Sequence, residues 1–138
     1  MAVDVTQLTD DTQLAVQALI EAAAKAGYTL RVRSAYRSCA EQHDLYNIGR
    51  GQNDTRAIVT QVDGCRTAHT WGRAVDVHSI QGGALADGRG LDGDYDNLGP
   101  LGEELGFIWG GRWKGFRDQG HFQFHPGLSV QEALDRYC

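Results

Sequence analysis

The sequence predicts a single α+β domain in which a small antiparallel sheet is flanked by helices. Several short segments alternate polar and apolar residues as strands do, while other segments carry helical periodicity or helix caps. Strands and helices do not alternate regularly, which argues against a doubly wound sheet. With 138 residues and 41% hydrophobic content, the chain can bury one core but is too short for two domains of ordinary size. We therefore expect one domain over residues 1–138.

The first third of the chain predicts a helix, a strand and a second helix. Apolar residues recur at helical spacing over 9–26, and 28–35 alternates as a half-buried strand does. Ser38 is followed three residues later by Glu41, which is the pattern of a capping box. We therefore expect the second helix to start there and to end near residue 48.

The rest of the chain combines loops with short elements. Residues 49–67 are rich in Gly, Asn, Asp and Thr and predict a long surface loop with at most one strand, around residues 57–62. Residues 74–80 alternate, which predicts a strand with Asp76 and His78 on one face. The remaining elements are expected to be a Gly- and Asp-rich loop over 81–97, a short helix over 99–105, strands over 107–109 and 121–124, and a last helix over 129–137.

Charge and hydropathy exclude two classes of partner. A formal net charge of -5 with no Lys/Arg run lacks the electrostatic footprint of a nucleic-acid binder. No apolar run approaches the ~20 residues that a membrane span needs, and no signal peptide is visible at the N-terminus. We expect a protein synthesised in the cytoplasm that another component must release if it acts outside the membrane.

Three cysteines, Cys39, Cys65 and Cys138, show no C-x-x-C spacing, which excludes a structural zinc knot. A bridge between Cys39 and Cys65 is compatible with the spacing. Cytosolic synthesis instead favours free, buried thiols, and this is the expectation we carry forward.

Two residues of types that bind metal ions lie on either side of an expected turn. His69 and Asp76 lie seven residues apart, and Gly72 between them lets the chain fold back so that both side chains reach one ion. A catalytic zinc takes three protein ligands and keeps an open position, so a third ligand is needed. The candidates for it are His43, His78, His121 and His125.

His121 is the preferred third ligand. It begins an aromatic strand, and Asp118 precedes it by three residues. Asp118 can then lie beside the metal without binding it. A carboxylate in that place can accept the proton of the attacking water and pass it to the leaving amine, as amide hydrolysis requires.

Three blocks of the sequence resemble a known zinc peptidase superfamily. Residues 68–76, Ala-His-Thr-Trp-Gly-Arg-Ala-Val-Asp, resemble its H-x-x-G-x-A-x-D signature. Residues 34–38 with Glu41 and Gln42 are similar to its early arginine block, and 106–122 to its closing block. The superfamily comprises the D-alanyl-D-alanine carboxypeptidases and dipeptidases and the L-alanyl-D-glutamate endopeptidases of peptidoglycan. The resemblance runs from about residue 30 to about residue 124 and implies a hedgehog/DD-peptidase-like fold.

The resemblance implies a role for each matching residue. His69, Asp76 and His121 would hold one Zn²⁺, and Asp118 would be the general base. Arg37 would be catalytic by stabilising the oxyanion and would also bind substrate.

The implied substrate is a peptidoglycan stem peptide. We assign Ser34, Gln42 and Trp113 to substrate binding beside the catalytic residues. The D-x-x-H spacing that ends at His121 is similar to the endopeptidase members, so we expect cleavage between L-Ala and D-Glu. Single-domain phage endolysins of this class lack a signal peptide because a holin releases them. The expected protein is similar to these: a monomer that acts on the cell wall after holin-type or other release.

Structural explanations compete with these roles. Asp118 could pair with Arg117 or Arg112 on a solvated loop, and Arg37 could pair with Glu41.

Four aromatic or imidazole side chains near the blocks receive lesser roles. His78 shares a face with Asp76, and we expect it at the rim of the site or hydrogen-bonded to a ligand. His125 precedes a proline and is expected outside the site. Trp109 is expected to pack in the core and Trp113 to lie at the rim.

Three other functions stay open. A D,D-carboxypeptidase would need a closed pocket for the terminal carboxylate, and a non-catalytic wall-binding module would have no use for Asp118. A calcium-regulated enzyme is suggested by four acids that lack the full EF-hand spacing, and we expect these to form a solvated loop. They are Asp87, Asp92, Asp94 and Asp96.

Overall fold

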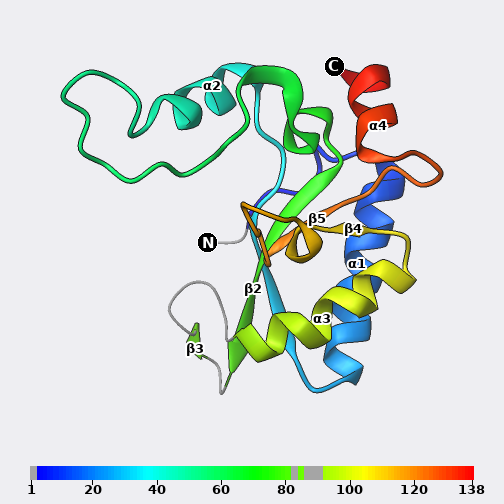
Figure 1. Ribbon diagram of the computed structural model, residues 1–138. Helices are drawn as coiled ribbons and strands as arrows, with labels where there is room; N and C mark the ends of the chain where they lie inside the picture. Colours follow the sequence, from blue (N-terminus) through cyan, green and yellow to red (C-terminus); the bar gives the residue numbers. More distant parts are fainter. Residues whose placement is uncertain (1–2, 82–83, 86–91) are drawn as a thin grey trace.

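The computed structural model describes residues 3–81, 84–85 and 92–138 (Figure 1). Its helices and strands confirm the α+β class predicted from the sequence. In chain order they are α1 (Asp10–Lys25), β1 (Thr29–Ser34), α2 (Cys39–Asn47), the 3-10 helices η1 (Gly64–Arg66) and η2 (Ala68–Trp71), β2 (Ala74–Gln81), β3 (Ala84–Leu85), α3 (Asp92–Glu104), β4 (Ile108–Trp109), the 3-10 helix η3 (Gly110–Arg112), β5 (His121–Gln123) and α4 (Val130–Tyr137).

Strand β2 is the centre of an antiparallel sheet with the order β1-β2-β5-β4, and β3 pairs with the end of β2. Its register places Asp76 opposite Ser34 on one side and opposite His121 on the other. The pairing of β1 with β2 is irregular between Val32 and Ser34. The sheet thus brings residues from three distant parts of the sequence to one point.

Helices α1 and α3 cover one face of the sheet, as Figure 1 shows. Leu19 of α1, Leu98 of α3 and Phe122 of β5 are fully buried in the core between them. Val75 and Val77 of β2 point into the same core. Because side chains alternate along a strand, Asp76 points to the opposite face of the sheet.

Helix α3 begins at Asp92, so the expected loop over 81–97 is wrong in its last part. Tyr95 and Leu98 lie three residues apart and are both buried, and the Tyr95 hydroxyl donates to the Val77 carbonyl at 3.2 Å. This tertiary contact favours a helix in a segment whose Gly and Asp content predicts a loop. The first part of the expected loop contains residues outside those that the structure describes.

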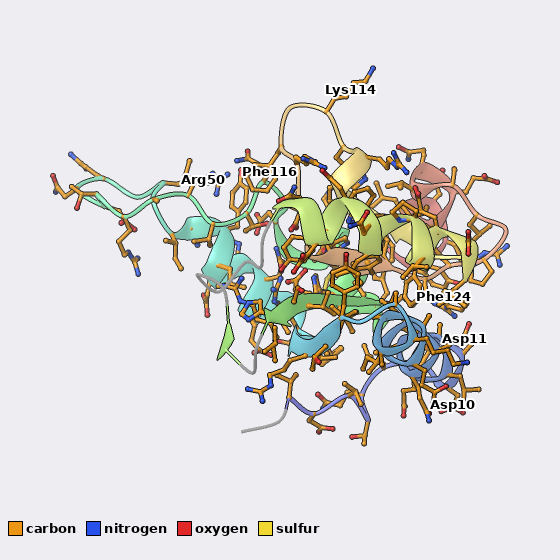
Figure 2. The ribbon with its side chains drawn as sticks, turned by 90° about the horizontal axis from the view of Figure 1, so that it is seen from below. Asp10, Asp11, Arg50, Lys114, Phe116 and Phe124 are labelled. Carbon is orange, nitrogen blue, oxygen red and sulfur yellow. A yellow bond between two sulfur atoms is a disulfide. The ribbon has the colours of Figure 1, made fainter. Side chains whose placement is uncertain are left out.

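The segment after α2 is a long loop, as expected, and it extends away from the sheet (Figure 1). No strand forms over 57–62, while η1 and η2 follow toward the end of the loop. Figure 2 shows Arg50 on this projecting loop and Lys114 pointing outward from the loop before β5. Within the described residues, no helix is long and apolar enough to cross a membrane.

Cys39 and Cys65 form a disulfide, so the expectation of free thiols is wrong for this pair. Cys39 is the first residue of α2 and Cys65 lies in η1, and their Cα atoms are 4.7 Å apart. The expectation was based on the place of synthesis, whereas the fold brings these two short elements into contact. Cys138 is free and exposed.

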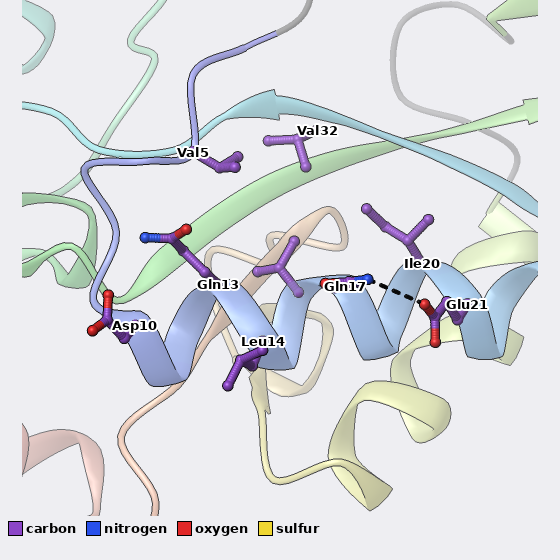
Figure 3. Close-up of a pocket in the computed structure, with 9 residues that line it drawn as sticks. Val5, Asp10, Gln13, Leu14, Gln17, Ile20, Glu21 and Val32 are labelled. Carbon is purple, nitrogen blue, oxygen red and sulfur yellow. Dashed lines mark hydrogen bonds between the residues drawn. The ribbon is translucent and has the colours of Figure 1, made fainter.

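A groove lies between α1 and the neighbouring segments that carry Val5 and Val32 (Figure 3). Val5, Leu14, Ile20 and Val32 line it together with polar residues of α1, among which Gln17 donates to Glu21. Val32 packs against the core, so this groove lies on the face of the sheet opposite Asp76. The groove is therefore separate from the site that contains Asp76.

Candidate active site

His69, Asp76 and His121 form a group that could hold one metal ion. One potential ligand atom from each residue lies within 4.8 Å of the others. His69 Nε2 is 3.3 Å from Asp76 Oδ2, and His121 Nδ1 is 3.2 Å from Asp76 Oδ1. Both imidazoles are nearly fully buried, whereas the Asp76 side chain is 20% exposed. Two nitrogens and one oxygen are the donor set of a catalytic zinc site with an open position.

The turn that carries His69 has the geometry expected from Gly72. His69 lies in η2, and Gly72 ends this helix with φ of +70°, the left-handed region that favours glycine. A Cβ at Gly72 would also meet the Gln7 carbonyl oxygen at 3.0 Å. His69 Nδ1 lies 2.7 Å from the Ala35 carbonyl oxygen, to which it can only donate. This bond leaves His69 Nε2 free as a lone-pair donor facing Asp76.

A buried chain of hydrogen bonds fixes the other imidazole. His121 Nε2 lies 2.7 Å from Gln123 Oε1, and Gln123 Nε2 lies 2.7 Å from His125 Nε2. His125 Nδ1 in turn lies 3.0 Å from the Leu128 carbonyl oxygen. Because a carbonyl only accepts, His125 donates from Nδ1, Gln123 donates to its Nε2, and His121 donates to Gln123. His121 Nδ1 is then unprotonated and faces the group.

His125 is therefore connected to the candidate site, although it is not one of the three grouped residues. We expected it outside the site because it precedes a proline. The sequence does carry a signal for this chain: His121, Gln123 and His125 alternate along the strand and its extension and so share one face. All three side chains are buried.

Arg37 reaches the group from the loop between β1 and α2. Its Nη2 donates to Asp76 Oδ2 at 3.1 Å and to Ser34 Oγ at 2.8 Å, and its Nη1 donates to Gln42 Oε1 at 3.1 Å. Glu41, the partner considered from the sequence, instead completes the capping box of α2 with Ser38. Arg37 is 22% exposed, so its guanidinium borders open space as well as Asp76.

Gln42 is only 1% exposed and cannot contact a substrate directly. It accepts from Arg37 and donates to the Val62 carbonyl at 2.7 Å. Gln42 therefore does not have the exposed position that the expected substrate contact requires, because the long loop covers its side chain. Gln42 instead joins α2 to Arg37 and to this loop.

Asp118 lies at the edge of the group. Its Oδ2 is 4.0 Å from His121 Nδ1, and its side chain is 40% exposed. Arg117 pairs with Asp96 and Arg112 pairs with Glu103, so neither forms the surface pair considered from the sequence. A Cβ at Gly110 would be 2.4 Å from the Asp118 carbonyl oxygen, so only glycine permits this close approach.

Burial and charge shift the pKa values of these groups. Burial raises the pKa of Asp118, and the negative charge of Asp76 acts in the same direction. Burial alone would raise the pKa of Asp76, but His69 and His121 hold it well below its usual range. Burial opposes the charged form of His121, yet the hydrogen bond that the charged ring donates to Asp76 and the charge of that carboxylate raise its pKa. These interactions therefore favour the ionised form of Asp76, and they place the pKa of Asp118 above that of an ordinary aspartate.

The tryptophans occupy the places expected for them. Trp109 is 3% exposed and its Nε1 donates to the Gln119 carbonyl at 2.7 Å, so it packs in the core. Trp113 is half-buried, and its ring lies 5.0 Å from that of His121. It therefore forms one wall beside the group.

The other two histidines considered as ligands lie outside the group. His43 is exposed and pairs with Asp63 at 2.7 Å. His78 follows Asp76 by two residues on β2 and is half-buried. Burial lowers the pKa of His78, and the charges of Arg33 and Arg31 also lower it.

The acidic residues of the calcium hypothesis do not form a solvated loop where the structure describes them. Asp94 is 6% exposed and accepts from the Ser79 hydroxyl at 2.8 Å. Asp96 pairs with Arg117 at 2.6 Å. Both belong to α3, while Asp87 lies outside the described residues. Within the described part of the chain, His69, Asp76 and His121 are the one group of three such side chains close enough to share an ion.

Comparison with known proteins points to one family. The model of the VanY family, described as D-alanyl-D-alanine carboxypeptidase, matches residues 5–126. The peptidoglycan L-alanyl-D-glutamate endopeptidase CwlK of Bacillus subtilis (strain 168) is 33% identical over 116 residues, covering 79% of this chain and 68% of CwlK. The L-alanyl-D-glutamate peptidase of Listeria phage A118 is 26% identical over 122 residues, covering 88% of this chain but only 40% of the phage protein.

Solved structures share the fold. The L-Ala D-Glu endopeptidase ChiX of Serratia marcescens superimposes with a TM-score of 0.64 at 20% identity, covering 88% of this chain and 83% of ChiX. The vancomycin resistance D,D-pentapeptidase VanY in complex with Zn(II) gives a TM-score of 0.64 at 18% identity, covering 94% of this chain and 83% of that chain. These likenesses confirm the DD-peptidase-like fold that the sequence blocks imply.

Proposed function

Since the chain belongs to the VanY family, described as D-alanyl-D-alanine carboxypeptidase, we propose that it is a zinc-dependent peptidase that cuts peptidoglycan stem peptides between L-Ala and D-Glu. The observation that carries the proposal is the convergence of His69, Asp76 and His121, with Asp118 at its edge and Arg37 beside it. The names of the two sequence relatives, both L-alanyl-D-glutamate peptidases, support this bond.

The residues present fit a zinc ion. One ring nitrogen of His69 and one of His121 each donate a hydrogen bond to a fixed acceptor. This arrangement orients imidazoles toward a metal. Zinc bound by His69, Asp76 and His121 would polarise the scissile carbonyl and make water a stronger acid. The side chains of Asp118, Arg37 and Trp113 add to this chemistry.

Asp118 serves as the general base. Its carboxylate accepts a proton from the attacking water and then donates it to the amine of D-Glu as the peptide bond breaks. Partial burial raises its pKa, so it holds this proton more readily than an ordinary aspartate would.

Arg37 stabilises the negative charge that develops on the carbonyl oxygen or docks a substrate carboxylate. Ser34 and Gln42 hold its guanidinium by hydrogen bonds to two different nitrogens. This places a permanent cation beside the group without movement during the reaction. Trp113 contributes an aromatic wall next to His121.

The runner-up function is a D,D-carboxypeptidase, which the description of the matching family favours. Both reactions use the same zinc chemistry and differ in the bond that is placed at the group. Mass spectrometry of purified peptidoglycan after digestion decides between them.

The digestion compares zinc-loaded wild-type protein with Asp118→Ala and with a chelated sample. Stem peptides with a new D-Glu amino terminus, absent from both controls, are expected. Loss of only the terminal D-Ala would move the assignment to the carboxypeptidase. No cleavage by the wild type would favour a wall-binding module that keeps this fold.

A further inference from the structure

Two arginines of β1 lie beside the candidate site on the edge of the sheet. Arg31 is directly opposite His78 in the register of β1 and β2, and Arg33 stands at the irregularity between Val32 and Ser34. Both arginine side chains are exposed. An irregularity of this kind re-aims a side chain next to a site. Arg31, Arg33 and His78 are called the β1 cationic patch below.

Neither arginine of this patch forms an ion pair within the described residues. Arg56, Arg112 and Arg117 each reach a carboxylate elsewhere, whereas neither Arg31 nor Arg33 does. Basic groups placed close together on a strand pair repel each other. The chain has a net charge of -5, so acids are plentiful, yet among the described residues none forms an ion pair with either arginine.

His78 adds an unsatisfied atom to the patch. Its Nε2 is buried and has no hydrogen-bond partner among the described residues. A buried polar nitrogen without a partner is unfavourable, and such atoms in native proteins call for an explanation. The His78 residue is only half-buried, and a rotation of its ring that brings this nitrogen to a ligand oxygen on the arginines would satisfy it.

The patch lies along β2 from the metal group. His78 is two residues from Asp76 and on the same face, which places it ~7 Å further along the strand. If the scissile bond of a substrate lies at Asp76, the first or second substrate residue beyond that bond lies near the patch.

We propose that the β1 cationic patch binds the side-chain carboxylate of the third residue of the stem peptide, on the D-Glu side of the scissile bond. This inference rests on the proposed function. Free carboxylates of a stem peptide lie only on that side, because L-Ala is joined to the glycan by an amide. The third residue lies one γ-linked D-Glu beyond the scissile nitrogen. At that position the side chains of diaminopimelate and lysine both carry an ammonium, and diaminopimelate carries a carboxylate in addition.

The patch therefore favours diaminopimelate-type over lysine-type peptidoglycan. Bound diaminopimelate supplies the counter-ion that Arg31 and Arg33 lack. Lysine offers the ammonium alone, so both guanidinium groups repel it and nothing attracts them. Amidation of the diaminopimelate carboxylate removes the attraction and leaves the same ammonium, so the amidated peptide is the matched substrate.

The test compares three N-acetylated tetrapeptides, L-Ala-γ-D-Glu-X-D-Ala, in which X is diaminopimelate, amidated diaminopimelate or lysine. Wild-type kcat/KM for the free carboxylate is expected to exceed that for the amide about fivefold. The double variant Arg31→Gln/Arg33→Gln is expected to lose this preference while it cleaves the amidated peptide as the wild type does. Arg136→Gln, which makes the same charge change on exposed helix α4, is expected to keep it.

A wild-type preference of less than about twofold would overturn the subsite. The subsite would also be overturned if the double variant had the same loss of kcat/KM on all three peptides and a melting temperature equal to that of the wild type. Cleavage of all three peptides at one rate would contradict the patch and leave the proposed function intact. If no peptide is cut, the proposed function fails, and calorimetric binding of the same peptides by Asp118→Asn still tests the patch.

Discussion

At the scale of single residues, Gln123 determines which nitrogen of His121 faces the metal group. The amide accepts from His121 and donates to His125, whose other nitrogen is held by the Leu128 carbonyl. Gln123→Leu removes both bonds and frees His121 to place its proton on the facing nitrogen. We expect zinc affinity to fall about 10- to 100-fold, the range found for partners of metal-bound histidines.

Chelator competition measures this affinity in the purified variants. Gln123→Glu keeps an acceptor for His121 and serves as the matched control, with affinity closer to the wild type. Unchanged affinity in Gln123→Leu would show that the hydrogen-bond chain does not position His121.

Asp118 is expected to matter for catalysis and not for metal binding. Asp118→Asn keeps the shape but cannot accept the proton, so kcat/KM should fall by about 10²- to 10⁴-fold. Zinc content, measured by elemental analysis, should match the wild type. A loss of zinc from this variant would instead identify Asp118 as a ligand.

The coupled pKa shifts of Asp76 and His121 predict opposite pH trends with and without zinc. In the metal-free protein, the raised pKa of His121 stabilises the fold below the ordinary histidine pKa, and this stability is lost as pH rises through the raised value. The lowered pKa of Asp76 gives stability that is lost only as pH falls through its own low value. Zinc needs an unprotonated imidazole, so its binding strengthens with pH.

The difference in melting temperature between zinc-loaded and chelated protein should therefore grow from about pH 5.5 to about pH 8. Differential scanning fluorimetry across this range measures it. A difference that is constant or shrinks with pH would argue against zinc at these imidazoles.

The sequence predicts the residues of the site better than the bonds between them. The spacing around Gly72 was sufficient to place His69 near Asp76, because the glycine requires a left-handed turn there. The burial of Gln42 could not be predicted, since it depends on where the long loop lies. Long-range packing of this kind leaves no periodic signal in the chain.

At the scale of elements, the disulfide ties helix α2 to the long loop. Cys39 follows the capping residue of α2, the helix whose Gln42 holds Arg37. The bridge closes a segment of 26 residues, which corresponds to ~3–4 kcal/mol of stability in the chain-entropy account. The double variant Cys39→Ser/Cys65→Ser should lose about this much in denaturant unfolding, and the wild type under reducing conditions should match it.

Activity of that variant at low temperature should fall less than its stability, because Asp76 and Ser34 still hold Arg37. Equal unfolding midpoints with and without reductant would mean that the bridge adds nothing to the fold. Local sequence signals cannot foresee the pairing, because it depends on contact between α2 and η1.

The capping boxes of α2 and α4 formed as the sequence predicts, since Ser38 with Glu41 and Ser129 with Glu132 act within four residues. The sequence does not predict the start of helix α3, for the opposite reason. Its glycines disfavour a helix locally, yet they let it approach the sheet: a Cβ at Gly102 would lie 2.5 Å from the Phe122 ring. Tertiary packing thus overrides local propensity in this element.

At the scale of the whole molecule, helices α1 and α3 cover one face of the sheet, and the candidate active site lies on the opposite face. The strand order could not be derived from periodicity, but the resemblance of three blocks in chain order implied the fold that the solved relatives share. A monomer and a single domain remain predictions. Light scattering after size exclusion should give the mass of one chain, 15.1 kDa, and a mass of two chains would contradict it.

The zinc site is tested most directly by a zinc titration of metal-free protein, with cleavage of purified peptidoglycan as the readout. Release of D-Glu amino termini is expected to rise with added zinc and to saturate at one ion per chain, and His69→Ala and His121→Ala are expected to stay inactive at that ratio. Cleavage that persists in chelator, or that saturates in the same way in the two histidine variants, would contradict the zinc site.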